Sequence, residues 1–190
     1  MISDVRRELI FWDVVYSAQF SVNTQEVSDW CYQLKEEDPG IHVSNKGGWH
    51  SKLIEYNTKT TPWKSIEEET VQFCQTAIED AGLNIAVKEL YGWVNINNPG
   101  SYNNPHNHPK TDLSVVYYPK VPAGSGNLIL ARTDAAVYGN LYNNHPIGRE
   151  FEIRPTEGHA YIFPAHLWHW VTPNQSEEDR ISITFNVECG

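Results

Sequence analysis

The sequence predicts a mainly β fold with N-terminal helices, a double-stranded β-helix or jelly roll, built as one domain over residues 1–190. From residue 86 to residue 188, about eight short runs rich in β-branched and aromatic residues alternate with Gly, Pro and Asn clusters. Ahead of them, between about residues 23 and 82, two amphipathic segments with helical periodicity need a surface to cover. A jelly roll backed by helices accounts for both observations, although an immunoglobulin-like sandwich would show the same strand rhythm.

The N-terminal part supplies one strand candidate and two helices. The apolar run over residues 9–20 is the strand candidate, and a helix is expected after Asn23, with a glutamate three residues later at the capping-box position. The second helix is expected to begin at a capping box of Ser65 and Glu68 and to stop at Gly82. Each helix carries one apolar stripe, which suits packing against a sheet.

The strands of the barrel are expected between residues 86 and 188. Asn- and Pro-rich stretches around residues 95–110 and 139–148 are expected to be loops. The strand candidates cover residues 89–97, 113–118, 126–132, 135–140, 151–155, 159–164, 167–173 and 180–186.

Composition and charge restrict the class of protein. The chain is 40% hydrophobic, which is enough for a sizeable core, and its formal net charge is -10. That charge disfavours binding to nucleic acid or to an anionic membrane, since both need clustered Lys and Arg. The three cysteines form no CxxC pair, and there is neither a membrane-spanning run nor a signal peptide. We therefore expect a cytoplasmic protein without a nucleic-acid or membrane partner.

The stretch NNPHNHPKTDLS, Asn103 to Ser114, contains two histidines one residue apart, His106 and His108. On extended backbone these side chains point to the same side, because strand side chains alternate with a period of two. The two imidazoles then converge on one point, as metal ligands do. A solvated pair in a loop is the alternative, and a third ligand would favour the metal site.

The candidate for that third ligand is His169. Its segment, GHAYIFPAHLWHWVTPN, is typical of a strand, a turn at Pro164 and a second strand, which a jelly roll can place opposite the first two histidines. His166 lies close to the turn and would face away from His169 on a regular strand, so we interpret it as structural or as a neighbour of the ligands. Trp168 and Trp170 flank His169 and are expected to pack under the N-terminal helices.

The last expected strand, RISITFN, alternates polar and apolar side chains. A polar face turned to solvent is the more usual interpretation of such a strand. If the face lines a barrel cavity instead, the Arg180 guanidinium offers a planar fork of donors for a carboxylate, and the Ser182 hydroxyl lies on the same side. The two residues then form a carboxylate clamp on the strand that follows His169.

These residues carry a resemblance to a known family. The run from YGWVNINNPGSYNNPHNHP through DLSVVYY and GSGNLILARTD to PTEGHAYIFPAHLWHWVTPNQSEEDRISITFN is similar to the Fe(II)- and 2-oxoglutarate-dependent oxygenases, specifically to a small uncharacterised bacterial and phage group. The likeness covers roughly residues 40–188 and includes SNKGGWHS. It implies a jelly-roll dioxygenase that uses Fe(II), 2-oxoglutarate and O2 and couples decarboxylation of 2-oxoglutarate to oxidation of a substrate, most often hydroxylation.

Carried over residue by residue, the resemblance makes His106 the first iron ligand and His169 the distal one. It makes Arg180 and Ser182 the clamp for the far carboxylate of 2-oxoglutarate. Asn97 stands where related prolyl-hydroxylase-like enzymes often have a tyrosine that touches the cosubstrate. The resemblance implies no catalytic residue beyond the metal centre.

His108 departs from the pattern of the family. The motif is HxD or HxE followed by a distant histidine, so His108 stands at the carboxylate position. Three neutral histidines leave Fe(II) with a charge that the doubly negative 2-oxoglutarate neutralises fully. Asp112, four residues after His108, is the alternative carboxylate ligand, although the spacing of the two early histidines favours His108.

Two other functions stay open. Cupins share the jelly roll, and the spacing of Gly100, His106 and Asp112 fits part of their motif, which predicts a metal-dependent dioxygenase or isomerase without 2-oxoglutarate. A jelly roll that binds a metal without catalysis is the second alternative. Cupins do not call for Arg180 and Ser182 on the final strand, and this pair favours the oxygenase.

The expected substrate is a small molecule or a protein side chain. Trp49, Trp63 and Trp93 are candidates for lining its entrance, although buried tryptophans are usually structural. Two copies of a helix-backed jelly roll often associate, so a homodimer is a further expectation.

Overall fold

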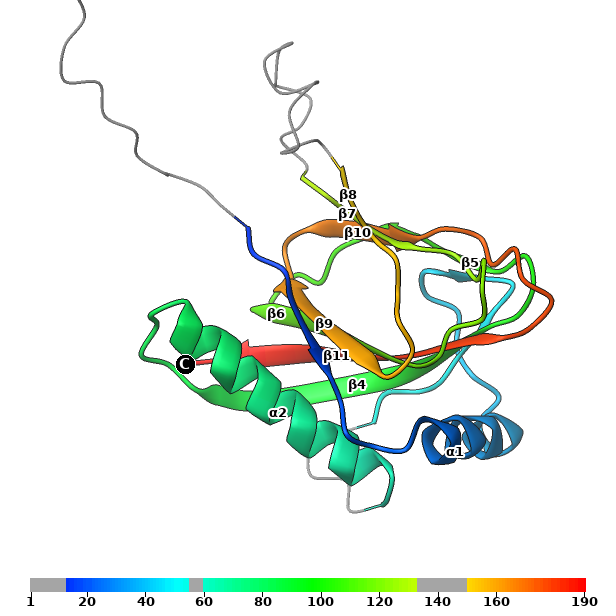
Figure 1. The fold of residues 1–190 in the computed structure, drawn as a ribbon, viewed down its shortest axis with the longest axis horizontal. Helices are drawn as coiled ribbons and strands as arrows, with labels where there is room; N and C mark the ends of the chain where they lie inside the picture. Colours follow the sequence, from blue (N-terminus) through cyan, green and yellow to red (C-terminus); the bar gives the residue numbers. More distant parts are fainter. Residues whose placement is uncertain (1–12, 55–59, 133–149) are drawn as a thin grey trace, which may run out of the picture.

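The computed structural model describes residues 13–54, 60–132 and 150–190. Its strands form two antiparallel sheets that face each other as a barrel, in the orders β1-β9-β6-β11-β4-β3 and β2-β5-β10-β7-β8 (Figure 1). This is the double-stranded β-helix that the sequence predicts. The elements are β1 (Tyr16–Gln19), α1 (Thr24–Glu37), β2 (Asn45–Lys46), β3 (Trp49–His50), α2 (Trp63–Asp80), β4 (Val87–Asn97), β5 (Tyr102–His106), β6 (Leu113–Lys120), β7 (Leu128–Ala131), β8 (Glu150–Ile153), β9 (His159–Pro164), β10 (Trp168–Val171) and β11 (Arg180–Cys189).

Helix α1 begins where the sequence predicts. The Asn23 side chain accepts hydrogen bonds from the backbone N–H groups of Gln25 and Glu26, at 3.0 and 3.2 Å, and so satisfies two donors that the first turn leaves unpaired. Val27 and Cys31, one turn apart, are fully buried against the six-stranded sheet. The cap and the apolar stripe together fix where this helix starts and which face it buries.

Helix α2 begins earlier than the sequence predicts. It starts at Trp63, with Pro62 in the capping position and no side chain that caps it, so the predicted capping box of Ser65 and Glu68 is wrong. The physical reason is tertiary packing: Trp63 is fully buried and draws the first turn onto the sheet. Its indole packs over Gly92 of β4, where even a methyl group would lie 2.9 Å from it.

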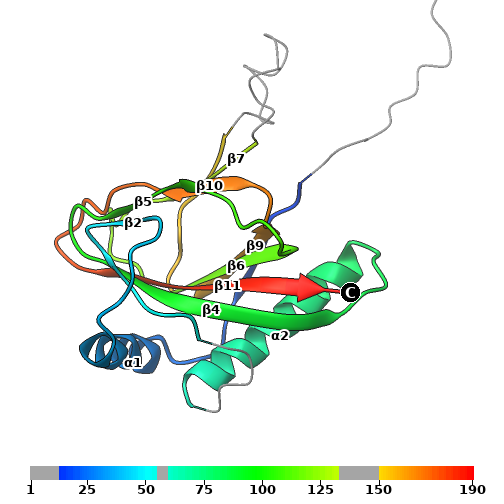
Figure 2. The ribbon, with the colours of Figure 1, turned by 180° about the vertical axis from the view of Figure 1, so that it is seen from behind.

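The six-stranded sheet has a helix side and a barrel side. Both views place the two helices on the same side of it (Figures 1 and 2). On the helix side lies the main apolar core, and between the two sheets lies a smaller one. The smaller core consists of Val116, Tyr118, Leu128, Leu130, Ile153, Tyr161, Phe163 and Leu167.

No described helix covers the five-stranded sheet. Trp168, on β10, is 38% exposed on its outer face, and neither Trp168 nor Trp170 belongs to the core under the helices. The predicted packing of these two tryptophans under the N-terminal helices is therefore wrong. Strand alternation correctly turns them away from His169, but the helices cover the other sheet.

Most of the expected strands are present in the described residues. The candidate over residues 135–140 lies outside them, and the one over residues 9–20 is described only from residue 13 and forms β1. The stretch around residues 95–110, expected to be a loop, contains β5. Its Pro105 is tolerated because it lies at an irregularity of the pairing with β10, where the register shifts between the pairs His169–His106 and Val171–Asn103.

None of the helices in the described ranges combines the length and the apolar character that crossing a membrane requires.

Candidate metal centre

Three histidines meet on the barrel side of the five-stranded sheet. His106 is the last residue of β5 and is the register partner of His169 on the neighbouring strand β10. His108 lies two residues beyond the end of β5, where its backbone N–H donates to the Ala165 carbonyl oxygen at 3.0 Å. Sequence spacing thus predicted the group, although only His106 of the early pair lies within the strand.

The geometry of this triad suits a single metal ion. One ligand atom of each imidazole lies within 4.8 Å of the others, and the Nε2 atoms of His108 and His169 are 3.1 Å apart. Two imidazole nitrogens bound to one metal at about 2.1 Å and at right angles lie about 3 Å apart. The observed separation is therefore the one that two ligands of the same ion adopt.

Backbone carbonyl groups select the tautomers that a metal needs. Nδ1 of His106 lies 2.7 Å from the Asn104 carbonyl oxygen, and Nδ1 of His169 lies 3.0 Å from the Leu167 carbonyl oxygen. A carbonyl oxygen only accepts, so each Nδ1 carries the hydrogen, and each Nε2 keeps its lone pair. This arrangement is typical of metal-ligating histidines, whose other ring nitrogen donates to a carbonyl or carboxylate group.

Burial keeps the three imidazoles neutral. Desolvation, together with the neighbouring His106, lowers the pKa of His108 to about 4 and that of His169 to about 3. Desolvation also lowers the pKa of His106, against the opposing effect of its hydrogen bond to Asn104. Neutral imidazole is the form that binds a metal, so the lone pairs are available near neutral pH.

Asp112 lies apart from the triad. Its carboxylate Oδ2 accepts a hydrogen bond of 2.8 Å from the backbone N–H of Cys189, at the end of β11. Within the described ranges, no aspartate or glutamate joins the three histidines. The geometry therefore favours His108 over Asp112 at the position where the family motif has a carboxylate.

Aromatic rings enclose the triad. The Trp93 indole contacts His108 with ring centroids 5.5 Å apart, and the Phe163 ring meets His169 edge-on at 5.0 Å. His50 stacks on Trp93 at 5.4 Å with an interplanar angle of 9°. The sequence alone assigned His50 no role. The only signal for it was the GGWHS motif, which belongs to the resemblance to the oxygenases.

Arg180 lies on the barrel side of β11 with only 1% of its surface exposed. Its Nη1 donates to the Ser125 carbonyl oxygen at 2.6 Å, and its Nε is buried without a partner. Among the described residues, no carboxylate pairs with it. Desolvation lowers the pKa of Arg180, but a guanidinium stays charged in proteins. A buried cation without a counter-charge needs an anion.

Ser182 and Asn97 lie near this guanidinium. Ser182 follows on the same face of β11, and Asn97 of β4 is the register partner of Arg180. The Asn97 Nδ2 already donates to Asn103 Oδ1 at 3.3 Å, whereas no described hydrogen bond uses the Ser182 hydroxyl. Gly126 leaves room for the arginine, because a methyl group there would lie 3.0 Å from the Nη1 of Arg180.

Several other sequence candidates lie away from the triad. His166 is exposed and its Nε2 is 3.2 Å from an Asp13 carboxylate oxygen, in accord with a structural interpretation. Trp63 belongs to the core under the helices, so it does not line an entrance. Trp49 donates its indole N–H to the Asp38 carbonyl oxygen at 3.0 Å. Of the three tryptophans proposed for the entrance, only Trp93 contacts the triad.

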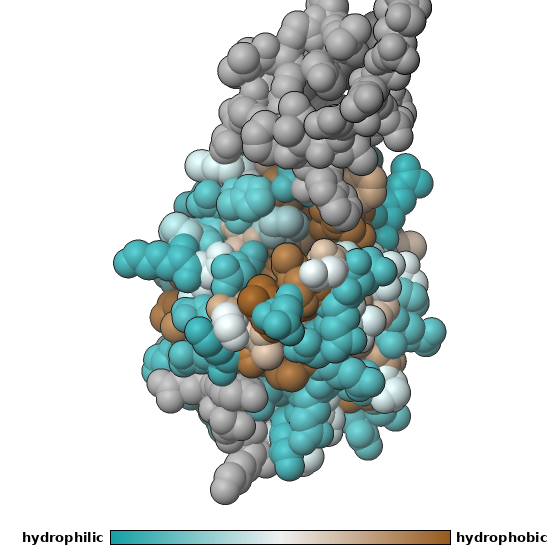
Figure 3. Space-filling model, turned by 90° about the vertical axis from the view of Figure 1, so that its left-hand side faces the viewer, coloured by the Kyte–Doolittle hydropathy of each residue, from teal (hydrophilic) through white to brown (hydrophobic). Residues whose placement is uncertain are grey.

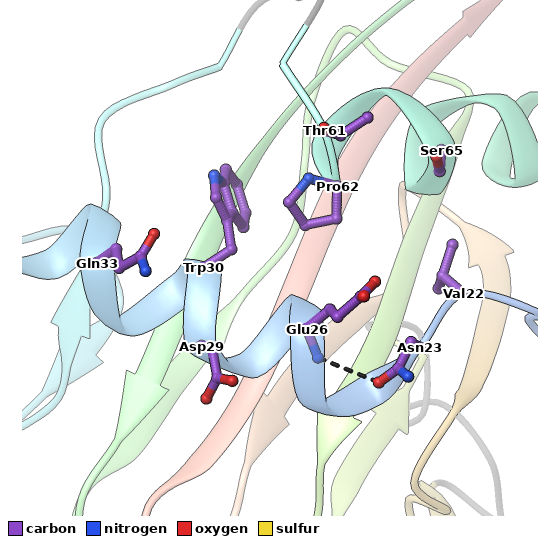
Figure 4. A pocket seen from close by; sticks show the side chains of 9 residues that line it. All are labelled: Val22, Asn23, Glu26, Asp29, Trp30, Gln33, Thr61, Pro62 and Ser65. Carbon is purple, nitrogen blue, oxygen red and sulfur yellow. Dashed lines mark hydrogen bonds between the residues drawn. The ribbon is translucent and has the colours of Figure 1, made fainter.

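A surface pocket of about 540 Å³ lies on the helix side, between α1 and the start of α2 (Figure 4). Glu26 and Trp30 of α1 face Pro62 across it, and it shares no residue with the triad.

A second surface lies at the end of the barrel where β11 finishes. Apolar side chains gather at the centre of that face, and polar side chains surround them (Figure 3). The triad lies toward this end, because His108 is four residues before Asp112, whose carboxylate is hydrogen-bonded to Cys189 at the end of β11.

Three converging imidazoles, two of them with Nε2 lone pairs fixed by backbone carbonyl groups, and an arginine without a counter-charge fit a metal ion and an organic anion between the sheets. This combination defines a jelly-roll metalloenzyme. The family model described as "Putative 2OG-Fe(II) oxygenase" matches residues 91–186, slightly more than half of the chain. The chain belongs to this family: it is a non-haem iron oxygenase that uses Fe(II), 2-oxoglutarate and O2.

Solved structures of low sequence identity share the fold. A prolyl-4-hydroxylase of Pseudomonas putida is 14% identical with a TM-score of 0.67, and the match covers 92% of this chain and 91% of that one. The viral collagen prolyl hydroxylase of Paramecium Bursaria Chlorella virus-1 is 13% identical with a TM-score of 0.60, over 91% and 94%. The epimerase SnoN from nogalamycin biosynthesis is 12% identical with a TM-score of 0.64, over 93% and 77%.

One curated relative is much larger. Colossin-A of Dictyostelium discoideum is 26% identical in an alignment of 152 positions that covers 74% of this chain. The match spans about 1% of the length of that protein.

Proposed function

We propose that His106, His108 and His169 hold the Fe(II) through their Nε2 atoms. The observation that carries this proposal is the pair of backbone carbonyl groups that fix the Nδ1–H tautomers of His106 and His169 and leave both Nε2 lone pairs facing the triad. Three neutral ligands leave the ion doubly charged, and the two carboxylates of 2-oxoglutarate neutralise it. A carboxylate ligand is then unnecessary, which agrees with the Asp112 carboxylate being hydrogen-bonded to the backbone of Cys189 rather than placed at the triad.

We propose that Arg180 and Ser182 bind the far carboxylate of 2-oxoglutarate. The unpaired Nε of Arg180 is a buried donor, and a bidentate carboxylate satisfies such a donor together with its charge. Ser182 adds a hydroxyl from the same face of β11. Asn97, whose side chain is beside Arg180, forms a wall of this binding site.

The iron and 2-oxoglutarate supply the oxidation when bound: 2-oxoglutarate is decarboxylated to succinate while the substrate is oxidised, most simply by hydroxylation. The residues of this chain supply positioning and an environment. The triad orients the ligand nitrogens, Arg180 anchors the cosubstrate, and Trp93 and Phe163 exclude water around His108 and His169. The proposal assigns no side chain a catalytic role beyond the metal centre.

We propose a small molecule or a protein side chain as the substrate. The structural relatives include prolyl hydroxylases and an epimerase, so the shared fold serves more than one substrate class. The net charge of -10 makes nucleic acid and anionic membranes poor partners. A homodimer and a cytoplasmic location stay predictions.

An anaerobic titration tests the cosubstrate. Fe(II) and then 2-oxoglutarate are added to the full chain, and we expect the visible charge-transfer band of the chelate. Admitting O2 should bleach the band and yield succinate. Absence of both the band and the succinate would refute the proposed assignment of the ligands.

Variants separate the two possible ligand sets. We expect His106→Ala and His169→Ala to abolish Fe(II) binding, measured by calorimetry on the folded proteins. His108→Ala should lose the metal while Asp112→Ala keeps it, and the reverse result would make Asp112 the ligand. Arg180→Ala should weaken 2-oxoglutarate binding and spare the metal, whereas the exposed Arg154→Ala should change neither.

A further inference from the structure

A second polar group lies on the barrel side of the six-stranded sheet, at the end of β11 opposite to Arg180. Asn186 of β11 is the register partner of Tyr91 on β4 and of Ser114 on β6. Their chain neighbours Phe185 and Val115 point into the core under the helices, so by strand alternation these three side chains point into the barrel. We call Tyr91, Ser114 and Asn186 the Asn186 cluster.

The Asn186 cluster lies beside the triad. Ser114 is the register partner of Phe163, the residue whose ring meets His169 edge-on. Tyr91 precedes Trp93 by two residues on the same face of β4, and the Trp93 indole contacts His108. Both flanks of the cluster are therefore residues that touch the proposed iron ligands.

The hydrogen-bonding capacity of the cluster is only partly used. Asn186 Nδ2 donates to the Tyr91 hydroxyl at 3.2 Å. The Asn186 Oδ1 and the Ser114 Oγ are both buried and have no partner. Buried polar atoms are nearly always paired, because an unpaired one has lost its water without replacement. Tyr91 is only partly buried, so the cluster extends to the molecular surface.

The cosubstrate does not fill this place in the proposed site. Arg180 and Asn186 are six residues apart on β11, which corresponds to about 20 Å along an extended strand. With its far carboxylate on Arg180, 2-oxoglutarate reaches the triad from the Arg180 end. The Asn186 end, on the other side of the metal position, is left for the substrate.

The chemistry of the cluster selects a class of substrate. Its three side chains are neutral, so it offers no counter-charge to an ionised group. The Tyr91 hydroxyl accepts from Asn186 and keeps its own hydrogen to donate, while Asn186 Oδ1 is free to accept. A donor and an acceptor side by side match the C=O and the syn N–H of a primary carboxamide, which point to the same side, whereas those of a trans secondary amide point in opposite directions.

We propose that the Asn186 cluster binds a primary carboxamide of the substrate, such as the side chain of an asparagine or a glutamine. Asn186 Oδ1 accepts from the amide N–H, and Tyr91 donates to the amide oxygen. This inference rests on the proposed function, which puts the metal at the triad. It makes Asn186 and Tyr91 residues that determine specificity.

Two probes, one with and one without an amide N–H, test the proposal. They are butyramide and methyl butyrate, and their affinities for the full chain with Zn(II) and 2-oxoglutarate are measured by saturation-transfer NMR. We expect the amide to bind about threefold to tenfold more tightly than the ester, the value of one hydrogen bond. The anionic butyrate should bind no better than the ester. Equal affinities for amide and ester would overturn the proposal.

Two variants locate the contact. Asn186→Leu, of similar size, should reduce the affinity for the amide to that for the ester. Tyr91→Phe should weaken both probes by a similar factor, because both retain the carbonyl oxygen; Tyr102→Phe, on the exposed outer side of β5, is the matched control. If Asn186→Leu fails to fold, Tyr91→Phe still decides, since unchanged affinities in that variant contradict the proposal.

The chelate band keeps the two proposals separate. A normal band with equal affinities for amide and ester would overturn the amide site and leave the iron and 2-oxoglutarate assignment standing. No band, with a preference for the amide that Asn186→Leu removes, would overturn the assignment of the ligands and support the Asn186 cluster as a binding site.

Discussion

The helix side and the barrel side of the six-stranded sheet are both buried, yet strand β11 turns apolar residues to the first and polar residues to the second. On the helix side of β11, Ile181, Ile183, Phe185 and Val187 are fully buried in one apolar core. On the barrel side, four polar atoms of three strands have no partner: Nε of Arg180, Oδ1 of Asn95 and of Asn186, and Oγ of Ser114; on the helix side two are unpaired, Nε1 of Trp63 and the hydroxyl of Tyr117, and both belong to large aromatic side chains of the apolar core. The apolar face of β11 thus stabilises the fold, whereas its polar face carries the residues of the proposed site, which cost stability while they lack a ligand.

The largest expected effect is a loss of stability on the helix side. Phe185→Ala removes a fully buried ring that packs on Trp63 at 4.9 Å, and the cavity should lower the free energy of unfolding by about 3–5 kcal/mol. Urea denaturation measures it. The barrel-side neighbour Ser182→Ala is the control and should cost about 1 kcal/mol or less. Equal losses in the two variants would contradict the division between the sides.

The reverse effect is expected at Arg180. Arg180→Leu replaces a buried, partly unpaired cation by an apolar side chain, so the free energy of unfolding should stay the same or rise by about 1–3 kcal/mol. The affinity for 2-oxoglutarate should fall by about 100-fold, because truncating one partner of a buried charge pair costs about 2–5 kcal/mol. Denaturation and anaerobic titration measure the two quantities. A variant that loses stability and keeps its affinity would place Arg180 in the fold rather than in the site.

A smaller effect, on both stability and the affinity for 2-oxoglutarate, is expected at Gly126. Its φ of +93° disfavours any side chain, and a methyl group would press on the Thr172 carbonyl oxygen and approach Nη1 of Arg180. Gly126→Ala should lower the free energy of unfolding by about 1–3 kcal/mol and should also weaken the binding of 2-oxoglutarate. Gly82→Ala, also at positive φ but with open space around it, is the control and should leave that affinity unchanged. Unchanged affinity in Gly126→Ala would show that the turn does not set the position of Arg180.

Local periodicity explains how much of the fold was predictable. The apolar stripe and Asn23 located α1, and the alternation of β11 located both faces of the sheet. The start of α2 was missed because a buried Trp63, a tertiary contact, overrides the local capping signal. Strand β5 was missed because its Asn and Pro residues favour turns locally, and only pairing with β10 makes them a strand.

Candidate site residues that lie close together in the chain were predictable from their spacing, whereas residues that only the pairing of strands brings together were not. The spacing of His106 and His108, and that of Arg180 and Ser182, is visible in the chain. The placement of Asn186 beside Tyr91 depends on the register between strands, which no local pattern contains. The interpretation of the polar face of β11 as solvated fails for the same reason, since a second sheet lies over it.

The smallest expected effect tests whether the helix side can change without the barrel side. Asn23 caps α1 by accepting from two backbone N–H groups, so Asn23→Ala should cost about 1 kcal/mol of stability. Because α1 packs on the opposite side of the sheet from the triad, we expect the affinities for Fe(II) and 2-oxoglutarate to be unchanged. Thermal denaturation and anaerobic titration of the same sample check both parts, with Asn23→Asp, which preserves the cap, as the control. A changed affinity would mean that the sheet transmits small shifts of α1 to the metal centre, and the two sides would then be coupled rather than independent.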